Sequence, residues 1–118
     1  MKTQMLAAIA GLGLLLASST SHADQSIEQI YGGYCVQCHG LQRNGTGINV
    51  PALSVKPRDH TEAKGMGDTP DDELFKAIKE GGLAVNKSVL MPTWGRVLSE
   101  DQIKGLVKYL RQVCKCGK

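Results

Sequence analysis

The chain has 118 residues, a formal net charge of +3 and an aromatic content of only 4%. This length fits one domain, and the charge is too small to indicate binding to nucleic acid or to an anionic membrane surface. A domain of this size with few aromatic side chains buries little apolar surface of its own, so we expect an additional stabilising group in its core.

The N-terminal segment, residues 1–23, has the pattern of a secretory signal peptide. Lys2 supplies a positive charge, Met5–Ala17 is almost wholly apolar, and residues 21–23 form a small-x-small cleavage site. The alternative is a membrane anchor, but the apolar run is shorter than the roughly 20 residues of a spanning helix. We therefore expect cleavage, export to a bacterial periplasm, no stable membrane insertion and a single domain over residues 24–118.

A first helix is predicted from Ser26 onward. Ser26 and Gln29 have the spacing of a capping box. Apolar residues then recur on one helical face at i, i+3, i+4 and i+7, and they are Ile27, Ile30, Tyr31 and Tyr34. The predicted helix leads directly into Cys35.

The segment Cys35-Val36-Gln37-Cys38-His39 is a Cys-x-x-Cys-His motif, which in an exported chain indicates covalent attachment of a c-type haem. Two thiols three positions apart reach the two vinyl groups on one porphyrin edge. His39 then lies under the iron and binds it as an axial ligand. One haem c, held by Cys35, Cys38 and His39, is therefore the expected cofactor.

Two other interpretations of the Cys-x-x-Cys pair are weaker. A thioredoxin-like redox pair needs a βαβ context, and no strand pattern flanks this motif. A zinc site usually needs two more ligands in a matching cluster, whereas the other two cysteines, Cys114 and Cys116, lie far downstream.

The middle of the chain is punctuated by glycine and proline. Residues 40–67 show poor helical periodicity, so we expect loops with at most a short turn or two. A structureless stretch of this length in a small domain is typical of a segment that wraps a ligand. A second helix is then predicted with Thr69 as N-cap and Pro70 at its first position, and Gly81 and Gly82 end it.

A second loop, residues 83–98, precedes the last predicted helix. Ser99 and Gln102 have the spacing of a second capping box. The apolar face of this helix comprises Ile103, Leu106, Val107, Leu110 and Val113, with Tyr109 at its edge. Three helices, long loops and no sheet are expected.

Cys114 and Cys116 are not needed to attach one haem. Free thiols rarely persist in an exported protein. The alternatives are a bond between the two cysteines in a very small ring, an intermolecular disulfide that links a dimer or a partner, or burial of Cys114 at the end of the apolar face. We favour a local or intermolecular disulfide.

The chain resembles the class I monohaem c-type cytochromes of the small bacterial kind. The resemblance rests on Cys35–Gly40 after one helix and on Leu90–Trp94 before a last helix that carries Tyr109-Leu110-Arg111. It implies an all-α cytochrome c fold with three main helices, of which the first and last cross near a right angle. Many members have a glycine near that crossing, where this chain has Ile27 and Glu28.

The resemblance also implies how the haem is held. Met91 matches the position of the methionine that binds iron opposite the histidine; Met66 and His60 are the other candidates for the sixth ligand. Pro51, twelve residues after His39, matches the proline whose carbonyl accepts the hydrogen bond of that histidine.

Arg58 and Trp94 are candidates for hydrogen bonds to the haem propionates; the alternatives are a surface charge and a core aromatic residue.

The expected function is therefore electron transfer in the periplasm and not enzymatic catalysis. His39 and Met91 would hold the iron, and redox partner proteins would dock transiently. One alternative is a haem subunit fixed to a periplasmic reductase or oxidase. Another is a small-ligand-binding or peroxidatic haem protein with a labile sixth ligand.

Overall fold

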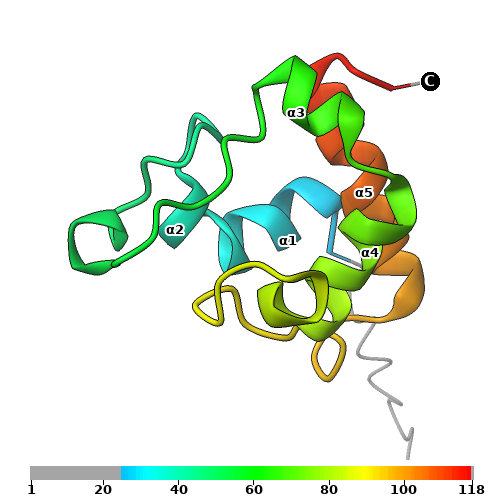
Figure 1. The fold of residues 1–118 in the computed structure, drawn as a ribbon. Coiled ribbons are helices and arrows are strands. Elements are labelled where there is room, and N and C mark those ends of the chain that lie inside the picture. The colour runs from blue at the N-terminus through cyan, green and yellow to red at the C-terminus, as the bar shows by residue number, and fades with distance from the viewer. Residues whose placement is uncertain (1–24, 118) are drawn as a thin grey trace, which may run out of the picture.

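The computed structural model describes residues 25–117, which form helices and loops and, within that range, no strand (Figure 1). The predicted signal peptide, residues 1–23, lies outside this range. In chain order the elements are α1 (Ile27–Tyr34), α2 (Val36–His39), the 3₁₀ turn η1 (Val50–Ala52), α3 (Ala63–Asp68), α4 (Asp71–Glu80), the 3₁₀ turn η2 (Gly82–Val85) and α5 (Glu100–Cys114). The all-α fold class is confirmed. Within residues 25–117, no helix has the length and apolar character needed to cross a membrane.

Both predicted capping boxes are present. The Ser26 amide donates to Gln29 Oε1 at 2.9 Å, and the Gln29 amide donates to Ser26 Oγ at 3.2 Å. Ser99 and Gln102 make the same two bonds at the start of α5, at 2.9 and 3.2 Å. These bonds satisfy amide groups that have no partner inside a helix, so the sequence alone defined where α1 and α5 begin.

The start of α4 differs from the prediction by one residue. Pro70 occupies the N-cap position and the helix begins at Asp71, so the assignment of Thr69 as the cap was wrong. The Thr69 hydroxyl is engaged elsewhere, because it donates to the Gly65 carbonyl at 2.8 Å. The helix ends at Gly81 as predicted, with a φ of 88° that favours glycine.

Helix α3 is longer than the short turn that the sequence suggested. Glu62 caps it, because its carboxylate accepts hydrogen bonds from the Lys64 amide at 2.9 Å and the Gly65 amide at 2.7 Å. Gly65 and Gly67 lower the helix propensity of this segment. The helix is instead stabilised by packing, since Met66 is fully buried and α3 contacts α5.

Helix α5 is the centre of the core and contacts α1, α3 and α4. Figure 1 shows it, in orange and red, alongside these helices. Its buried residues are Ile103, Leu106, Val107, Tyr109, Leu110 and Cys114. The predicted apolar face is therefore correct except that Val113 is only partly buried and Tyr109 is inside the core. Where α1 meets α5, Ile27 lies against Gly105.

Candidate functional site

A cavity of about 850 Å³ opens between the helices and the loops. This volume is within the range of roughly 300–1,000 Å³ that is typical of pockets for small molecules and cofactors. Most of its lining is apolar and includes Leu74, Ile78, Trp94, Leu106 and Leu110. A planar apolar group such as a porphyrin fits this lining, and it would add apolar surface to the core that α5 organises.

The three residues of the Cys-x-x-Cys-His motif lie in one wall of this cavity. Cys35 ends α1 and precedes α2, and its carbonyl accepts the His39 amide at 2.9 Å. This single helical turn holds Cys35, Cys38 and His39 together on the cavity side. Both thiols are free, as covalent attachment of haem requires.

Two rival uses of the cysteines are disfavoured by the structure. Burial, with the nearby Cys38 as a smaller cause, raises the pKa of Cys35 to about 12. A thioredoxin-like site needs a lowered thiol pKa instead. For zinc, no group of three or more His, Cys, Asp or Glu side chains in residues 25–117 is arranged to hold a metal ion.

The surroundings of the His39 ring are those that an iron-binding imidazole would need. Its ring is buried, and burial lowers its pKa despite a bond to a backbone carbonyl that acts in the opposite direction. The imidazole therefore stays neutral near pH 7. Nδ1 bonds the Arg58 carbonyl at 2.9 Å, which makes Nδ1 the protonated nitrogen and leaves the Nε2 lone pair for iron.

The structure corrects the predicted partner of His39. The prediction was the Pro51 carbonyl, whereas the carbonyl of Arg58 accepts this bond. Pro51 lies in η1 and is exposed. The physical reason is the path of the loop between them, because the chain returns to the side of His39 only after η1.

Backbone hydrogen bonds define that path. The Gly45 amide donates to the His39 carbonyl at 2.8 Å, and the Gly47 amide donates to the Cys38 carbonyl at 3.0 Å. The chain then turns outward through η1 and comes back where the His60 amide donates to the Arg43 carbonyl at 2.8 Å. The spacing of residues after His39 does not reveal this loop path, so it does not predict which carbonyl lies next to the His39 ring.

His60 lies beside the proximal histidine. Its ring stacks on that of His39, with centroids 4.1 Å apart and planes inclined by 18°. Its Nδ1 lies 3.0 Å from the Tyr31 hydroxyl. Burial lowers the pKa of His60 to about 3, and the electrostatic effects of the neighbouring His39 and Arg58 are smaller causes in the same direction. His60 is therefore a neutral, buried neighbour of His39. The sequence suggested it only as a candidate for the sixth ligand, and no signal in the sequence indicated that its ring stacks on that of His39.

Two methionines line the cavity. Met91 is partly buried and lies in the loop between η2 and α5, where its carbonyl accepts the Gly82 amide at 3.0 Å. Met66 of α3 is fully buried. The two methionines thus approach the cavity from different elements.

Arg58 and Trp94 also line the cavity. The Arg58 guanidinium donates to the Gly65 carbonyl and to Thr69 Oγ1, each at 2.9 Å. The Trp94 ring packs on that of Tyr34, with centroids 5.2 Å apart. Their roles toward the propionates stay predictions.

Comparison with known proteins agrees with this site. The family described as cytochrome c oxidase, cbb3-type, subunit III matches residues 22–110. The solved structure of the KustC0563 c-type cytochrome has a TM-score of 0.60 and 24% sequence identity, and the match covers 75% of this chain and 98% of that chain. At this identity the similarity concerns the fold alone. No curated protein matches the chain. The chain belongs to the cbb3-type subunit III family of c-type cytochrome domains, and it is a monohaem cytochrome that carries covalently bound haem c and transfers electrons.

Proposed function

We propose that this cytochrome is a periplasmic carrier of single electrons in which His39 and Met91 are the two axial ligands. The observation that carries the proposal is that Met91, from a separate loop, lines the same cavity as the Cys-x-x-Cys-His motif. The loop that holds Met91 is tied to η2 through the bond between the Gly82 amide and the Met91 carbonyl. This bond holds the backbone at Met91 in place.

The arrangement of the other candidates also favours Met91. A sixth ligand must reach the iron from the porphyrin face opposite His39, whereas His60 stacks on the His39 ring itself. Met66 is fully enclosed in the core. To reach the iron it would have to leave that packing, which costs burial energy. Met91 is only partly buried, so a movement of its side chain toward the iron would cost less burial energy.

This ligand pair suits electron transfer. The bound haem supplies the Fe(III)/Fe(II) couple. A thioether favours Fe(II), so ligation by His39 and Met91 raises the reduction potential relative to two imidazoles. Both axial positions are then filled by the protein, which excludes substrate from the iron. This supports a carrier rather than an enzyme.

The mouth of the cavity supports transient docking of redox partners. Three apolar residues that line the cavity are also exposed to solvent: Val55 (52%), Val89 (71%) and Leu90 (44%). Lys56 and Lys87 also line the cavity. Exposed apolar side chains flanked by lysines fit a partner surface with an apolar centre and acidic rim, and such electron-transfer interfaces are small.

Export to the periplasm is supported by two features. Residues 1–23 have the composition of a secretory signal peptide. The chain also contains a disulfide bond between Cys114 and Cys116, and disulfide bonds persist in oxidising compartments.

The ligand assignment is tested by absorption spectra of the holoprotein. We expect the weak near-infrared band of an Fe(III)–thioether bond in the parent protein, its loss in Met91→Ala, and its retention in the control variants Met66→Ala and His60→Ala. The reduced parent protein should bind carbon monoxide weakly. Loss of the band in Met66→Ala alone, or tight carbon monoxide binding by the parent, would overturn the proposal.

A second candidate function is that of a haem subunit fixed to a larger oxidase or reductase. The family match to cbb3-type subunit III favours it. Size-exclusion chromatography of detergent extracts from the source cells separates the two possibilities. A free carrier elutes as a small protein, whereas a fixed subunit elutes with its complex at all salt concentrations.

A further inference from the structure

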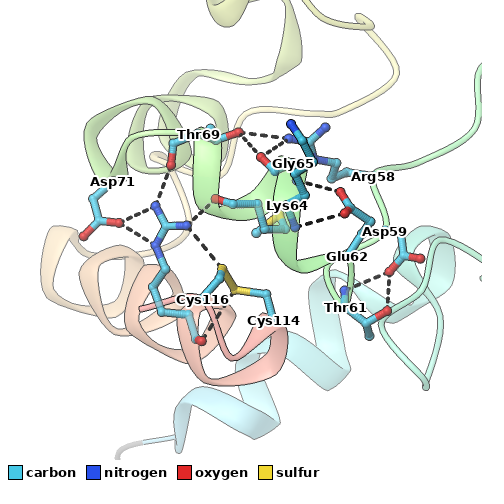
Figure 2. Close-up of a disulfide and its surroundings, with 12 residues drawn as sticks. Arg58, Asp59, Thr61, Glu62, Lys64, Gly65, Thr69, Asp71, Cys114 and Cys116 are labelled. Carbon is cyan, nitrogen blue, oxygen red and sulfur yellow. Dashed lines mark hydrogen bonds and ion pairs between the residues drawn. A yellow bond between two sulfur atoms is a disulfide. The ribbon is translucent and has the colours of Figure 1, made fainter. Parts of the chain in front are cut away.

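Cys114 and Cys116 form a disulfide bond across a single residue at the end of α5, with Cα atoms 5.1 Å apart (Figure 2). The chain has four cysteines, and haem occupies the other two, Cys35 and Cys38. The Cys114–Cys116 pair therefore provides the only thiol chemistry of the holoprotein. Of the alternatives that the sequence left open, the structure contains the local bond, and Cys114 is also buried at the end of the apolar face.

Stabilisation of the fold is a weak explanation for this bond. A disulfide stabilises mainly by restricting the unfolded chain, and the effect is smallest for the shortest loops. A loop that encloses only Lys115 restricts almost nothing. Exposed disulfides are instead the kind that exchange readily with other thiols, and Cys116 is partly exposed.

The two sulfur atoms have different surroundings. Cys114 is only 3% exposed, and its Sγ lies 3.5 Å from the Arg111 carbonyl near the C-terminal end of α5. A carbonyl at this end of a helix carries partial negative charge and disfavours a thiolate. Cys116 is partly exposed, and its Sγ lies 3.7 Å from Nη1 of the Arg111 guanidinium. A cation at this distance favours a thiolate.

The guanidinium of Arg111 is held firmly in place. It donates to the carbonyl of Met66, to the carbonyl of Thr69 at 2.6 Å and to Asp71 Oδ1 at 2.7 Å. Only 15% of its side chain is exposed, so water screens its charge weakly. A fixed cation next to the more accessible sulfur is the arrangement of reactive cysteines.

We propose that the Cys114–Cys116 pair is a thiol–disulfide exchange site that reacts with an external dithiol, and that Cys116 is the sulfur that the partner attacks. A thiolate of the dithiol attacks Cys116 Sγ and forms a mixed disulfide. The Cys114–Cys116 bond breaks, and Cys114 leaves as a thiolate that takes a proton from solvent.

The second half of the reaction releases the partner. Its remaining thiol loses a proton to solvent, and the resulting thiolate attacks the partner's own sulfur in the mixed disulfide. Cys116 leaves as a thiolate, which the Arg111 guanidinium stabilises. The dithiol has then lost two electrons and two protons and become a disulfide, and the protein disulfide has become two thiols. Neither step involves the haem iron.

The first test uses the holoprotein with its haem kept ferrous by ascorbate, so that thiol consumption reports on the disulfide alone. Millimolar dithiothreitol at pH 7 should reduce the bond within minutes, and iodoacetamide should then label Cys114 and Cys116 with no change in the haem spectrum. A bond that resists dithiothreitol until the fold is disrupted by denaturant would overturn the proposal.

Single-cysteine variants test the asymmetry. In Cys114→Ser the remaining Cys116 should react with the aromatic disulfide of Ellman's reagent at least tenfold faster than Cys114 reacts in Cys116→Ser. The alkylation rate of Cys116 should titrate below the value of about 8.5 of an ordinary cysteine. Equal rates, or titration at or above that value, would contradict the assigned role.

The role of Arg111 is tested in the Cys114→Ser background. Arg111→Gln should slow the reaction of Cys116 at least tenfold, whereas Arg111→Lys should largely preserve it, because the charge is kept. Intact haem absorption shows whether each variant is folded. If Arg111→Gln does not fold, the pH dependence of Cys116 alkylation in Cys114→Ser decides the question.

Discussion

Gly105 of α5 lies directly against Ile27 of α1: a Cβ atom at position 105 would be 2.4 Å from Ile27 Cδ1 and 2.9 Å from Ile27 Cγ1. The close approach of these two helices therefore depends on the missing side chain. Related cytochromes were expected to have a glycine on the first helix at this crossing. Here the last helix supplies the glycine, and the first helix supplies the side chain that packs on it.

Replacement of Gly105 by alanine should destabilise the folded protein. Alanine gains about 1 kcal/mol of helix propensity over glycine, but overpacking costs typically 1–3 kcal/mol. We therefore expect a net loss in the free energy of unfolding, measured by guanidinium titration of the holoprotein.

The control for this prediction removes the Ile27 side chain that faces position 105. In an Ile27→Ala background the space opposite position 105 is open, so Gly105→Ala should stabilise the protein by the propensity gain of about 1 kcal/mol. A destabilising effect of the same size in both backgrounds would show that Ile27 is not the cause.

Gly47→Ala should disturb the haem-attachment segment. A Cβ atom at Gly47 would lie 2.3 Å from the Gln37 carbonyl oxygen and 2.6 Å from the Cys38 carbonyl carbon. These are backbone atoms, which cannot move aside without shifting the turn that holds the two cysteines. We expect a loss of about 1–3 kcal/mol in the free energy of unfolding and a lower yield of holoprotein. Gly33→Ala is the matched control, because nothing lies within 4 Å of a Cβ there.

Pro51→Ala should leave the haem reduction potential unchanged, because the Arg58 carbonyl and not that of Pro51 accepts the bond from His39. Pro57→Ala should shift it, since Pro57 precedes this carbonyl and its own carbonyl packs on Gly45. Redox titration measures both variants, and the NMR signal of the His39 Nδ1 proton reports on the bond itself. A shift of the reduction potential in Pro51→Ala alone would show that the Pro51 carbonyl accepts the His39 hydrogen bond, as the sequence suggested.

The stability of the protein should depend on pH through Glu100. The Lys79 ammonium donates to Glu100 Oε1 at 2.6 Å, and this bond and the charge of Lys79 lower the pKa of that carboxyl below its usual value. A carboxyl with a lowered folded-state pKa stabilises the fold above its unfolded pKa of about 4.3. This contribution is lost as the pH falls through the lower folded value.

Glu100→Gln should therefore be less stable than the parent at pH 7, and the difference should disappear in acid. Denaturation midpoints at several pH values measure this. Glu28→Gln is the control, because Glu28 also lies in the first turn of a helix but forms no ion pair within residues 25–117. A pH-dependent difference of equal size in Glu28→Gln would assign the effect to the helix dipole rather than to Lys79.

Local signals account for what the sequence predicted correctly. The capping boxes at Ser26 and Ser99, the end of α4 at Gly81 and the Cys-x-x-Cys-His turn each depend on residues within a few positions of one another. Helix α3 was missed because its glycines oppose helix formation, while burial of Met66 against α5 stabilises it. The energy that stabilises α3 as a helix therefore comes from contacts with residues distant in the chain.

The sequence by itself determined the class of cofactor and the starts of α1 and α5, because the Cys-x-x-Cys-His motif and the capping boxes each depend on residues within a few positions of one another. Only the tertiary structure decided which carbonyl bonds His39, which residue stacks on its ring and which helix carries the glycine at the crossing. Loop paths and helix contacts bring together residues such as His39 and Arg58, whose proximity depends on the packing of the whole chain and not on their spacing.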